Sequence, residues 1–127
     1  MELNINKCSI ISFSQKKTIL DFNYKFLNLK IQRVYLIIDL GVFFDTKMNF
    51  KQHINKIKNK ASSKLGFLKR QCSNFNNHFA LKNIYFSIVR SQLEYAAFIW
   101  SPNSLILNQT LDSFQNSFLR FYLINVM

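Results

Sequence analysis

The stretch LIIDLGVFFDTKMNFKQHINKIKNKASSKLGFL, residues 36–68, decides the fold, because the pattern of apolar residues changes within it near residue 48. Beyond that point apolar residues recur at spacings of four, three, four, four and three. At 100° per residue they fall within an arc of roughly 80°. The spacing predicts an amphipathic helix from about residue 50 to Arg70. Its apolar residues are Phe50, Ile54, Ile57, Ala61, Leu65 and Leu68.

The pattern upstream of this helix is that of short strands. Apolar and polar side chains alternate from Phe22 to Ile31, which predicts strands with one buried face. The alternation changes parity between Phe26 and Leu27, which indicates a turn or a bulge there. A compact apolar run, CSIISFS, precedes this segment at residues 8–14.

Two further helices are predicted downstream. The first runs from about Phe79 to Ile99, with Asn77 as its N-cap and Ser101-Pro102 as its stop. Its expected apolar face consists of Leu81, Ile84, Tyr85, Ile88, Tyr95, Ala96 and Ile99. The second carries an apolar seam at four-three-four-three spacing, which is typical of packing on neighbouring helices. The seam consists of Leu107, Leu111, Phe114, Phe118 and Phe121.

Strands followed by helices predict an α+β fold. We expect a small N-terminal antiparallel β-hairpin or sheet in residues 1–47 and a three-helix bundle in residues 48–127. Trp100, before Ser-Pro, is interpreted as a core anchor at a helix end. His53, beside the apolar arc of the first helix, is interpreted as a helix-surface residue.

The charge of the chain favours a polyanionic partner. It has 17 Lys and Arg against 6 Asp and Glu, a formal net charge of +11. Cations concentrate on the first helix, which has no acid among residues 50–70, whereas solvated helix faces usually mix both signs. We therefore predict contact with a nucleic-acid backbone. The predicted contact residues are Lys51, Lys56, Lys58, Lys60, Lys64, Lys69 and Arg70.

Several other classes of site find no support in the sequence. The two cysteines and two histidines are isolated, so no zinc site is predicted. Asp39 and Asp45 are six residues apart and are interpreted as a turn acid and a strand-end acid, not as a metal-binding pair. With two glycines the chain has no phosphate-cradling loop. The uncharged run 95–111 contains Ser, Pro, Asn and Gln, and we expect no membrane span.

Three stretches together resemble the C-terminal part of the reverse transcriptase of jockey-like non-LTR retrotransposons. They are IDLGVFFDTKMNFKQHINKIKNKASSKLGFLKRQC (38–72), LKNIYFSIVRSQLEYAAFIWSP (81–102) and LDSFQNSFLRF (111–121). LNINKCSIISFS (3–14) is similar to the segment that follows the catalytic aspartates of that enzyme. The resemblance departs from the family pattern at Asn77-His78, where the family often has Asp-Pro.

The resemblance implies roles for several residues. Residues 1–47 would be the end of the palm and residues 48–127 the thumb, which closes on an RNA/DNA primer–template. Lys7 would lie near the incoming nucleotide, and Leu40 and Gly41 would form the primer-grip hairpin. The family catalyses RNA-templated DNA synthesis with two Mg²⁺, but its metal-binding aspartates have no counterpart in this chain. We therefore expect a truncated polymerase with no cofactor of its own and no activity alone.

Two other functions stay open on sequence grounds. One is a residual nucleic-acid-binding module that uses the basic helix, residues 50–70. The other is a helical protein-interaction module that uses the Leu107 to Phe121 seam, with self-association through exposed apolar surface. An intracellular protein is expected, in the nucleus or the cytoplasm.

Overall fold

The structure is a computed structural model that describes residues 4, 7–17, 22–26, 28–100 and 105–126, except for the side chains of residues 106, 107 and 126. The chain forms two compact units, an N-terminal unit (Met1–His53) and a C-terminal unit (Ile54–Met127). All described strands precede the first helix. This order confirms the predicted α+β fold with an N-terminal β-hairpin and a three-helix region.

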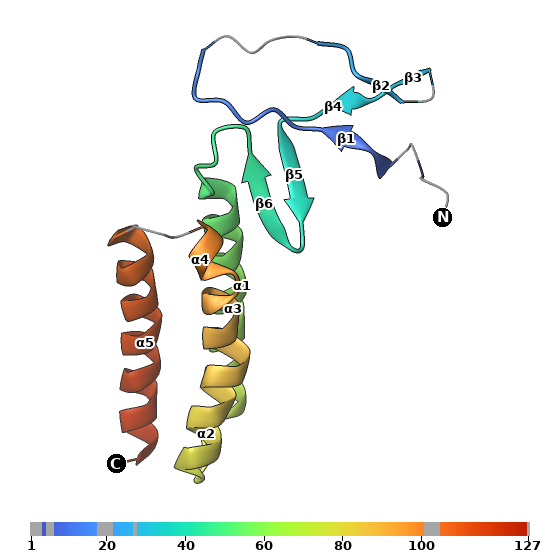
Figure 1. Ribbon diagram of the computed structural model, residues 1–127. Coiled ribbons are helices and arrows are strands. Elements are labelled where there is room, and N and C mark those ends of the chain that lie inside the picture. The colour runs from blue at the N-terminus through green and yellow to red at the C-terminus, as the bar shows by residue number, and fades with distance from the viewer. Residues whose placement is uncertain (1–3, 5–6, 18–21, 27, 101–104, 127) are drawn as a thin grey trace. The chain divides into compact units, whose positions relative to one another are not determined.

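The strands of the N-terminal unit pair two by two (Figure 1). Two of the three ladders are antiparallel, as expected, and one is parallel. The parallel ladder joins β1 (Ser9–Ile10) to β4 (Gln32–Arg33), and the antiparallel ladders join β2 (Lys25–Phe26) to β3 (Leu29–Lys30) and β5 (Leu36–Asp39) to β6 (Val42–Asp45).

The β2–β3 hairpin corrects one prediction and confirms another. The expected buried face is wrong, because Phe22 is 64% exposed and Leu29 is 53% exposed. Alternation indicates an extended chain, but a ladder of two residue pairs offers too little surface to build a packed face. The expected turn is present between Phe26 and Leu29, where Asn28 has a φ of 64°. Leu27 lies outside the described residues.

The β5–β6 hairpin closes with a two-residue turn. Both turn residues have positive φ, 46° at Leu40 and 82° at Gly41. That combination gives the tight turn whose twist matches the flanking strands. Beyond the turn Val42 is buried, and the ring of Phe44 meets that of Phe50 edge to face, with centroids 5.6 Å apart. The hairpin therefore packs against the residue that immediately precedes the first helix.

Helix α1 (Lys51–Gln71) forms where it was predicted. Ile57, Ala61, Leu65 and Leu68 are buried on one face, as their spacing indicated. His53 is buried as well, with 3% of its surface exposed, so its interpretation as a surface residue is wrong. The reason is a contact with β6, because the His53 ring lies beside Phe43 and accepts that residue's amide hydrogen.

The predicted second helix is interrupted. It consists of α2 (His78–Ile84), a π-helical segment η2 (Tyr85–Arg90), α3 (Ser91–Glu94) and α4 (Ala97–Trp100). Asn77 is the N-cap of α2, as predicted, and its side chain accepts the Ala80 amide hydrogen at 3.1 Å. The continuous helix to Ile99 is wrong, because the chain breaks at Tyr95 and Ala96, where Ala96 has a φ of 52°.

The π-helical segment changes which residues are buried. Leu81, Tyr85, Val89 and Leu93 form the buried stripe, and they are spaced by four throughout. In an α-helix a step of four overshoots a full turn by about 40°. The wider π-helical turn offsets this drift and keeps the stripe on one side. The predicted face is therefore wrong at three positions that are exposed, namely Ile88, Tyr95 and Ile99.

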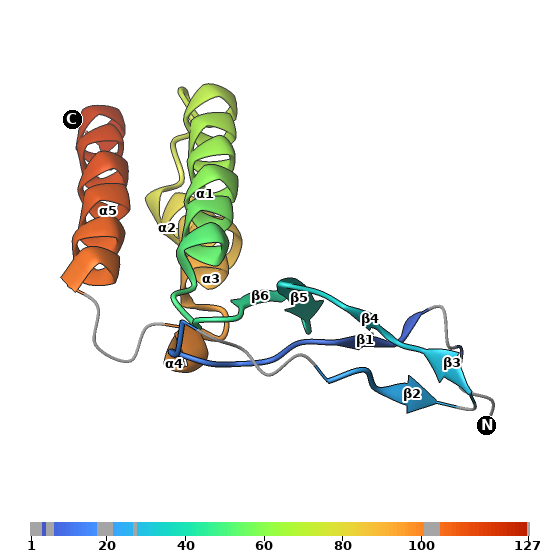
Figure 2. The same ribbon diagram turned by 90° about the horizontal axis from the view of Figure 1, so that it is seen from above.

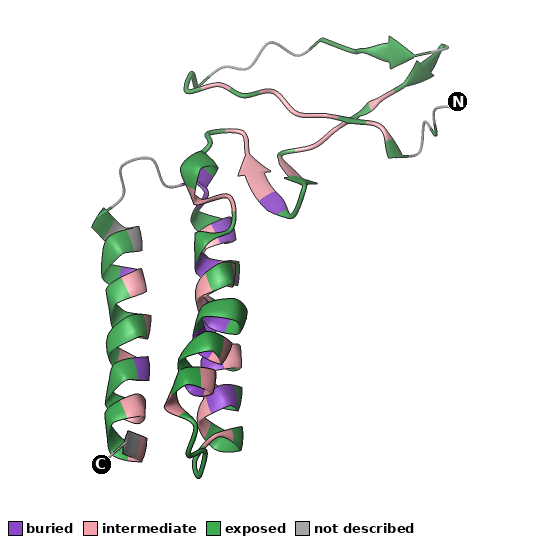
Figure 3. Ribbon diagram, turned by 60° about the horizontal axis from the view of Figure 1, so that its bottom comes forward, coloured by how far each residue is buried: buried purple, intermediate pink, exposed green. Residues whose placement is uncertain are grey.

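Trp100 and α5 (Leu105–Val126) complete the C-terminal unit. Trp100 is buried and its Nε1 donates to the Tyr95 carbonyl oxygen at 2.9 Å, which confirms it as a core anchor. Figures 1 and 2 show that α1 and α5 run in the same direction, with α2, η2 and α3 running the opposite way beside them. Figure 3 shows buried residues on the sides of these helices that face one another. Phe118 of the predicted seam is buried, with 4% of its surface exposed.

Candidate nucleic-acid interface

The cations of α1 form two rows that flank its buried stripe. Because α1 is uninterrupted, Lys56, Lys60 and Lys64 follow one another at intervals of four and share one side of the helix. Lys58 and Lys69, eleven residues apart, lie on the other side of the stripe. Arg70 projects away from the stripe, and Lys51 stands in the first turn, which belongs to the N-terminal unit. Lys51, Lys56, Lys60 and Arg70 are exposed and Lys58, Lys64 and Lys69 are half-buried.

The charge on α1 is not balanced within the helix. Residues 51–71 contain seven cations and no acid. Like charges four residues apart destabilise a helix by about 0.2–0.5 kcal/mol per pair. The row of Lys56, Lys60 and Lys64 holds two such pairs. A polyanion laid along this row would relieve this repulsion. A helix of mixed charge with a net negative sign would instead repel the polyanion.

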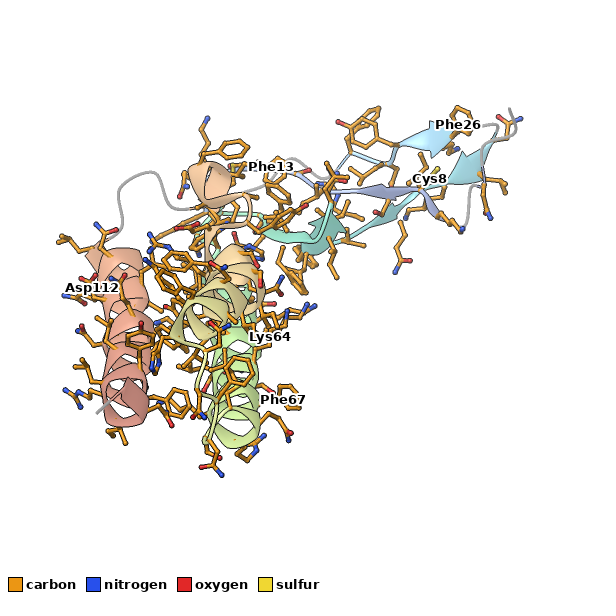
Figure 4. All side chains as sticks on the ribbon, turned by 90° about the horizontal axis from the view of Figure 1, so that it is seen from below. Cys8, Phe13, Phe26, Lys64, Phe67 and Asp112 are labelled. Carbon is orange, nitrogen blue, oxygen red and sulfur yellow. The ribbon has the colours of Figure 1, made fainter. Side chains whose placement is uncertain are left out.

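An exposed aromatic ring lies among these cations. Phe67 is 55% exposed and stands on the same side of α1 as Lys64, as Figure 4 shows. Arg70 follows Gly66 by one helical turn. A guanidinium nitrogen of Arg70 lies 3.4 Å from the position that a Cβ on Gly66 would take. Phe67 was not among the predicted contact residues, because those were chosen by charge, and it was not among the predicted apolar residues of this helix either.

A groove lies between α5 and Lys69 of the other row. The Lys69 Nζ donates to the Ser117 Oγ at 2.8 Å, which ties α1 to α5. The groove has a volume of about 590 Å³, and Arg120 and Asn116 line it beside this pair. From sequence alone Arg120 could reach either a phosphate or Asp112. The structure places Arg120 in the groove, with Asp112 outside its lining.

Arg90, which from sequence alone could reach a phosphate or pair with Glu94, lies in η2. Its Nε donates to the Glu94 carboxylate at 2.6 Å. This hydrogen bond raises the pKa of Arg90. Arg90 is thus paired within the segment formed by η2 and α3 and takes no part in the rows of α1.

The three residues singled out by the resemblance lie in the N-terminal unit. Leu40 is at the tip of the β5–β6 hairpin and is 82% exposed, with Gly41 beside it. Lys7 is exposed in a short turn before β1, and its amide donates to the Asn4 carbonyl oxygen at 3.0 Å. The roles assigned to these residues stay predictions.

The two aspartates of the hairpin do not converge. Asp39 pairs with Val42 and Leu36 pairs with Asp45, so the alternation of side chains places Asp39 and Asp45 on opposite faces. The Asp45 Oδ1 accepts the Asn49 amide hydrogen at 2.8 Å, which fixes the turn before α1. Among the described residues no three His, Cys, Asp or Glu side chains are grouped so as to hold a metal ion. The residues described here therefore do not fit the two Mg²⁺ ions of the polymerase family.

No helix in the described part of the chain is both long enough and apolar enough to cross a bilayer.

No family model matches the chain, and no solved structure matches it. The chain is 38% identical over 77 residues to an uncharacterized protein of Caenorhabditis elegans. The match covers 58% of this chain and 37% of the relative, so this chain spans well under half of that protein's length.

Proposed function

We propose that this chain is the palm-end and thumb part of a reverse transcriptase similar to those of jockey-like non-LTR retrotransposons, and that it holds the backbone of a primer–template through α1. The main support is the charge of α1, with seven cations and no acid on a helix whose other face is buried. Lysine ammonium groups contact phosphates as point charges, so they bind backbone without reading base sequence.

The spacing of the cations suits a polyanion with regularly placed charges. Lys56 and Lys64 are eight residues apart, a rise of about 12 Å along the helix axis. Lys60 lies midway between them on the same side. One nucleic-acid strand running beside α1 would therefore meet successive ammonium groups. Each phosphate that a lysine neutralises releases counterions, which makes the affinity depend on salt.

The order of elements gives a second line of support. A tight hairpin with Leu40 and Gly41 at its tip directly precedes the basic helix, and the interrupted helix from α2 to α4 and then α5 follow. The resemblance expects this order for a primer grip followed by a thumb. An exposed backbone tip at Gly41, where no side chain intervenes, allows the close approach that a primer end would require.

Binding without polymerisation is the expected behaviour of this chain by itself. Two-metal phosphoryl transfer requires carboxylates that converge on both ions. Asp39 and Asp45 lie on opposite faces of their hairpin and do not meet this requirement. Under the proposal, the chain contributes contacts to the primer–template, and groups outside it contribute the chemistry.

The experiment is a fluorescence-anisotropy titration of a labelled DNA primer on an RNA template, between 50 and 200 mM salt. We expect the logarithm of affinity to fall linearly with the logarithm of salt concentration. Changing Lys56, Lys60 and Lys64 together to Ala should reduce the slope by about 2 to 3. A matched variant changes three exposed lysines of the N-terminal unit, Lys25, Lys30 and Lys47, to Ala and removes the same charge.

Equal losses in the two triple variants would show that net charge matters and α1 does not. Binding that ignores salt, or no binding at 50 mM salt, would contradict the proposal. Nucleotide incorporation on the same substrate with Mg²⁺ present would contradict the expectation of binding alone.

A further inference from the structure

We propose that the groove between α1 and α5 is a phosphate-binding site, formed by Lys69, Arg120 and polar side chains of α5, that takes a phosphodiester of the bound nucleic acid. The inference rests on the proposed function and extends it from α1 to α5, which carries none of the predicted contact residues. In the sequence the site has no local signature, because Lys69 and Ser117 are 48 residues apart.

Hydrogen-bond donors converge in the groove from both helices. The Ser117 Oγ accepts the hydrogen bond from Lys69 at 2.8 Å, and its own hydroxyl hydrogen can therefore donate to another acceptor. The Asn116 amide and the Arg120 guanidinium line the groove on the same helix, and both groups are exposed. Ammonium, hydroxyl, amide and guanidinium donors together suit a ligand that has several oxygen acceptors and a negative charge.

The charge of the groove also favours a negatively charged ligand. Its described lining residues include two cations and no acid. Lys69 stands in the last turn of α1, where a cation also complements the helix dipole. The dipole accounts for Lys69, but it does not account for Arg120, which lies before the last turn of α5, or for the amide and hydroxyl beside them. An Arg fork additionally binds two oxygens of one phosphate, which a lysine cannot do.

The surroundings favour a nucleic-acid backbone as the source of that phosphate. Lys58 lies on the same flank of α1 as Lys69, a rise of about 16 Å before it. A strand that contacts Lys58 and continues along this flank would reach the groove. The groove is also lined by Phe121 and Ile124, and it offers apolar surface for a sugar beside the polar groups.

The experiment uses the full chain and the same labelled primer–template. Arg120→Gln should lower the affinity by about three- to tenfold at 50 mM salt and reduce the salt slope by about 1. Arg120→Lys, which keeps the charge but loses the fork, should keep the slope and recover only part of the affinity. Lys82→Gln is the control, because Lys82 is an exposed lysine of the same unit outside this groove.

Thermal unfolding of each variant shows whether it remains folded. If Arg120→Gln and Lys82→Gln behave alike while the α1 triple variant still loses affinity, the groove is not a site and the proposed function stands. If the wild-type chain does not bind, both proposals fall. If Arg120→Gln loses affinity and the α1 triple does not, the groove is supported and the lysine row is overturned.

Discussion

Tyr85 and Phe118 stack face to face, with ring centroids 4.0 Å apart and planes inclined by 10°. Both residues are buried, with 2% and 4% of their surface exposed. Such aromatic pairs contribute about 0.5–1.5 kcal/mol beyond the area that they bury. The stack joins η2 to α5 and helps to fix α5 in the C-terminal unit, on which the bond between Lys69 and Ser117 depends.

The Tyr85 hydroxyl predicts a loss of stability at alkaline pH. Burial raises the pKa of Tyr85; the Arg90 charge opposes this shift and the Glu94 charge adds to it. The folded chain therefore holds this proton at a pH at which the unfolded chain has released it. Under proton linkage the free energy of unfolding then falls as the pH rises above about 10. We expect Tyr85→Phe, which keeps the stacked ring, to weaken this fall.

Urea unfolding followed by circular dichroism at several pH values between about 8 and 11 measures the effect. Tyr95→Phe serves as the control, because that ring is 53% exposed in the same unit. If the alkaline loss of stability is the same in Tyr85→Phe as in the wild-type chain, the buried hydroxyl is not its source.

A second prediction concerns the edge of the β5–β6 hairpin. Phe43 belongs to a pair between the hydrogen-bonded pairs of the ladder, so its amide points away from β5. The Nδ1 of His53 accepts this hydrogen at 3.4 Å. His53→Phe keeps an aromatic ring but removes the acceptor, which should destabilise the hairpin by about 1 kcal/mol.

Amide hydrogen exchange measured by NMR separates this role from simple packing. The amide of Phe43 should exchange markedly faster in His53→Phe, whereas that of Phe44, which bonds to β5 within the ladder, should change less. Equal acceleration at both amides would mean that His53 stabilises the hairpin by filling space.

The helices show which buried stripes can be predicted from the spacing of apolar residues. The buried stripe of α1 follows from spacings of three and four, because these spacings place the side chains on a single face of an α-helix. The residues of this stripe are Ile57, Ala61, Leu65 and Leu68. The stripe through Leu81, Tyr85, Val89 and Leu93 does not follow, because a spacing of four fits an α-helix only with a drift. The π-helical segment removes that drift, but no residue type in the sequence predicts where a π-helical segment forms.

The candidate site shows a different limit. The lysines of α1 are visible in the sequence, because they are close together and lack neighbouring acids. The groove at Lys69 and Arg120 depends on how α5 packs, and packing is decided by contacts such as the one between Tyr85 and Phe118. The burial of His53 was not predicted for a related reason, since its ring lies beside Phe43, 10 residues earlier in the chain, and accepts that residue's amide hydrogen.

The last prediction concerns the hairpin tip, where the structure holds an unfavourable residue. Leu40 has a φ of 46°, in the left-handed region, and is 82% exposed, so the fold gains little from its side chain. A left-handed conformation costs a residue with a Cβ about 1–2 kcal/mol, and asparagine before glycine is much better suited to this turn. Leu40→Asn should therefore stabilise the hairpin by about 1 kcal/mol.

Leu40→Ala separates strain from contact, because it removes the exposed apolar surface and keeps a Cβ at the same φ. Slower exchange of the Phe44 amide in Leu40→Asn, but not in Leu40→Ala, would show that strain is relieved; no change in either variant would contradict it. Under the proposed function both variants should weaken primer–template binding in the anisotropy assay, since an exposed leucine kept in a strained turn fits a residue that contacts a ligand. Unchanged binding in both would remove Leu40 from the proposed primer grip.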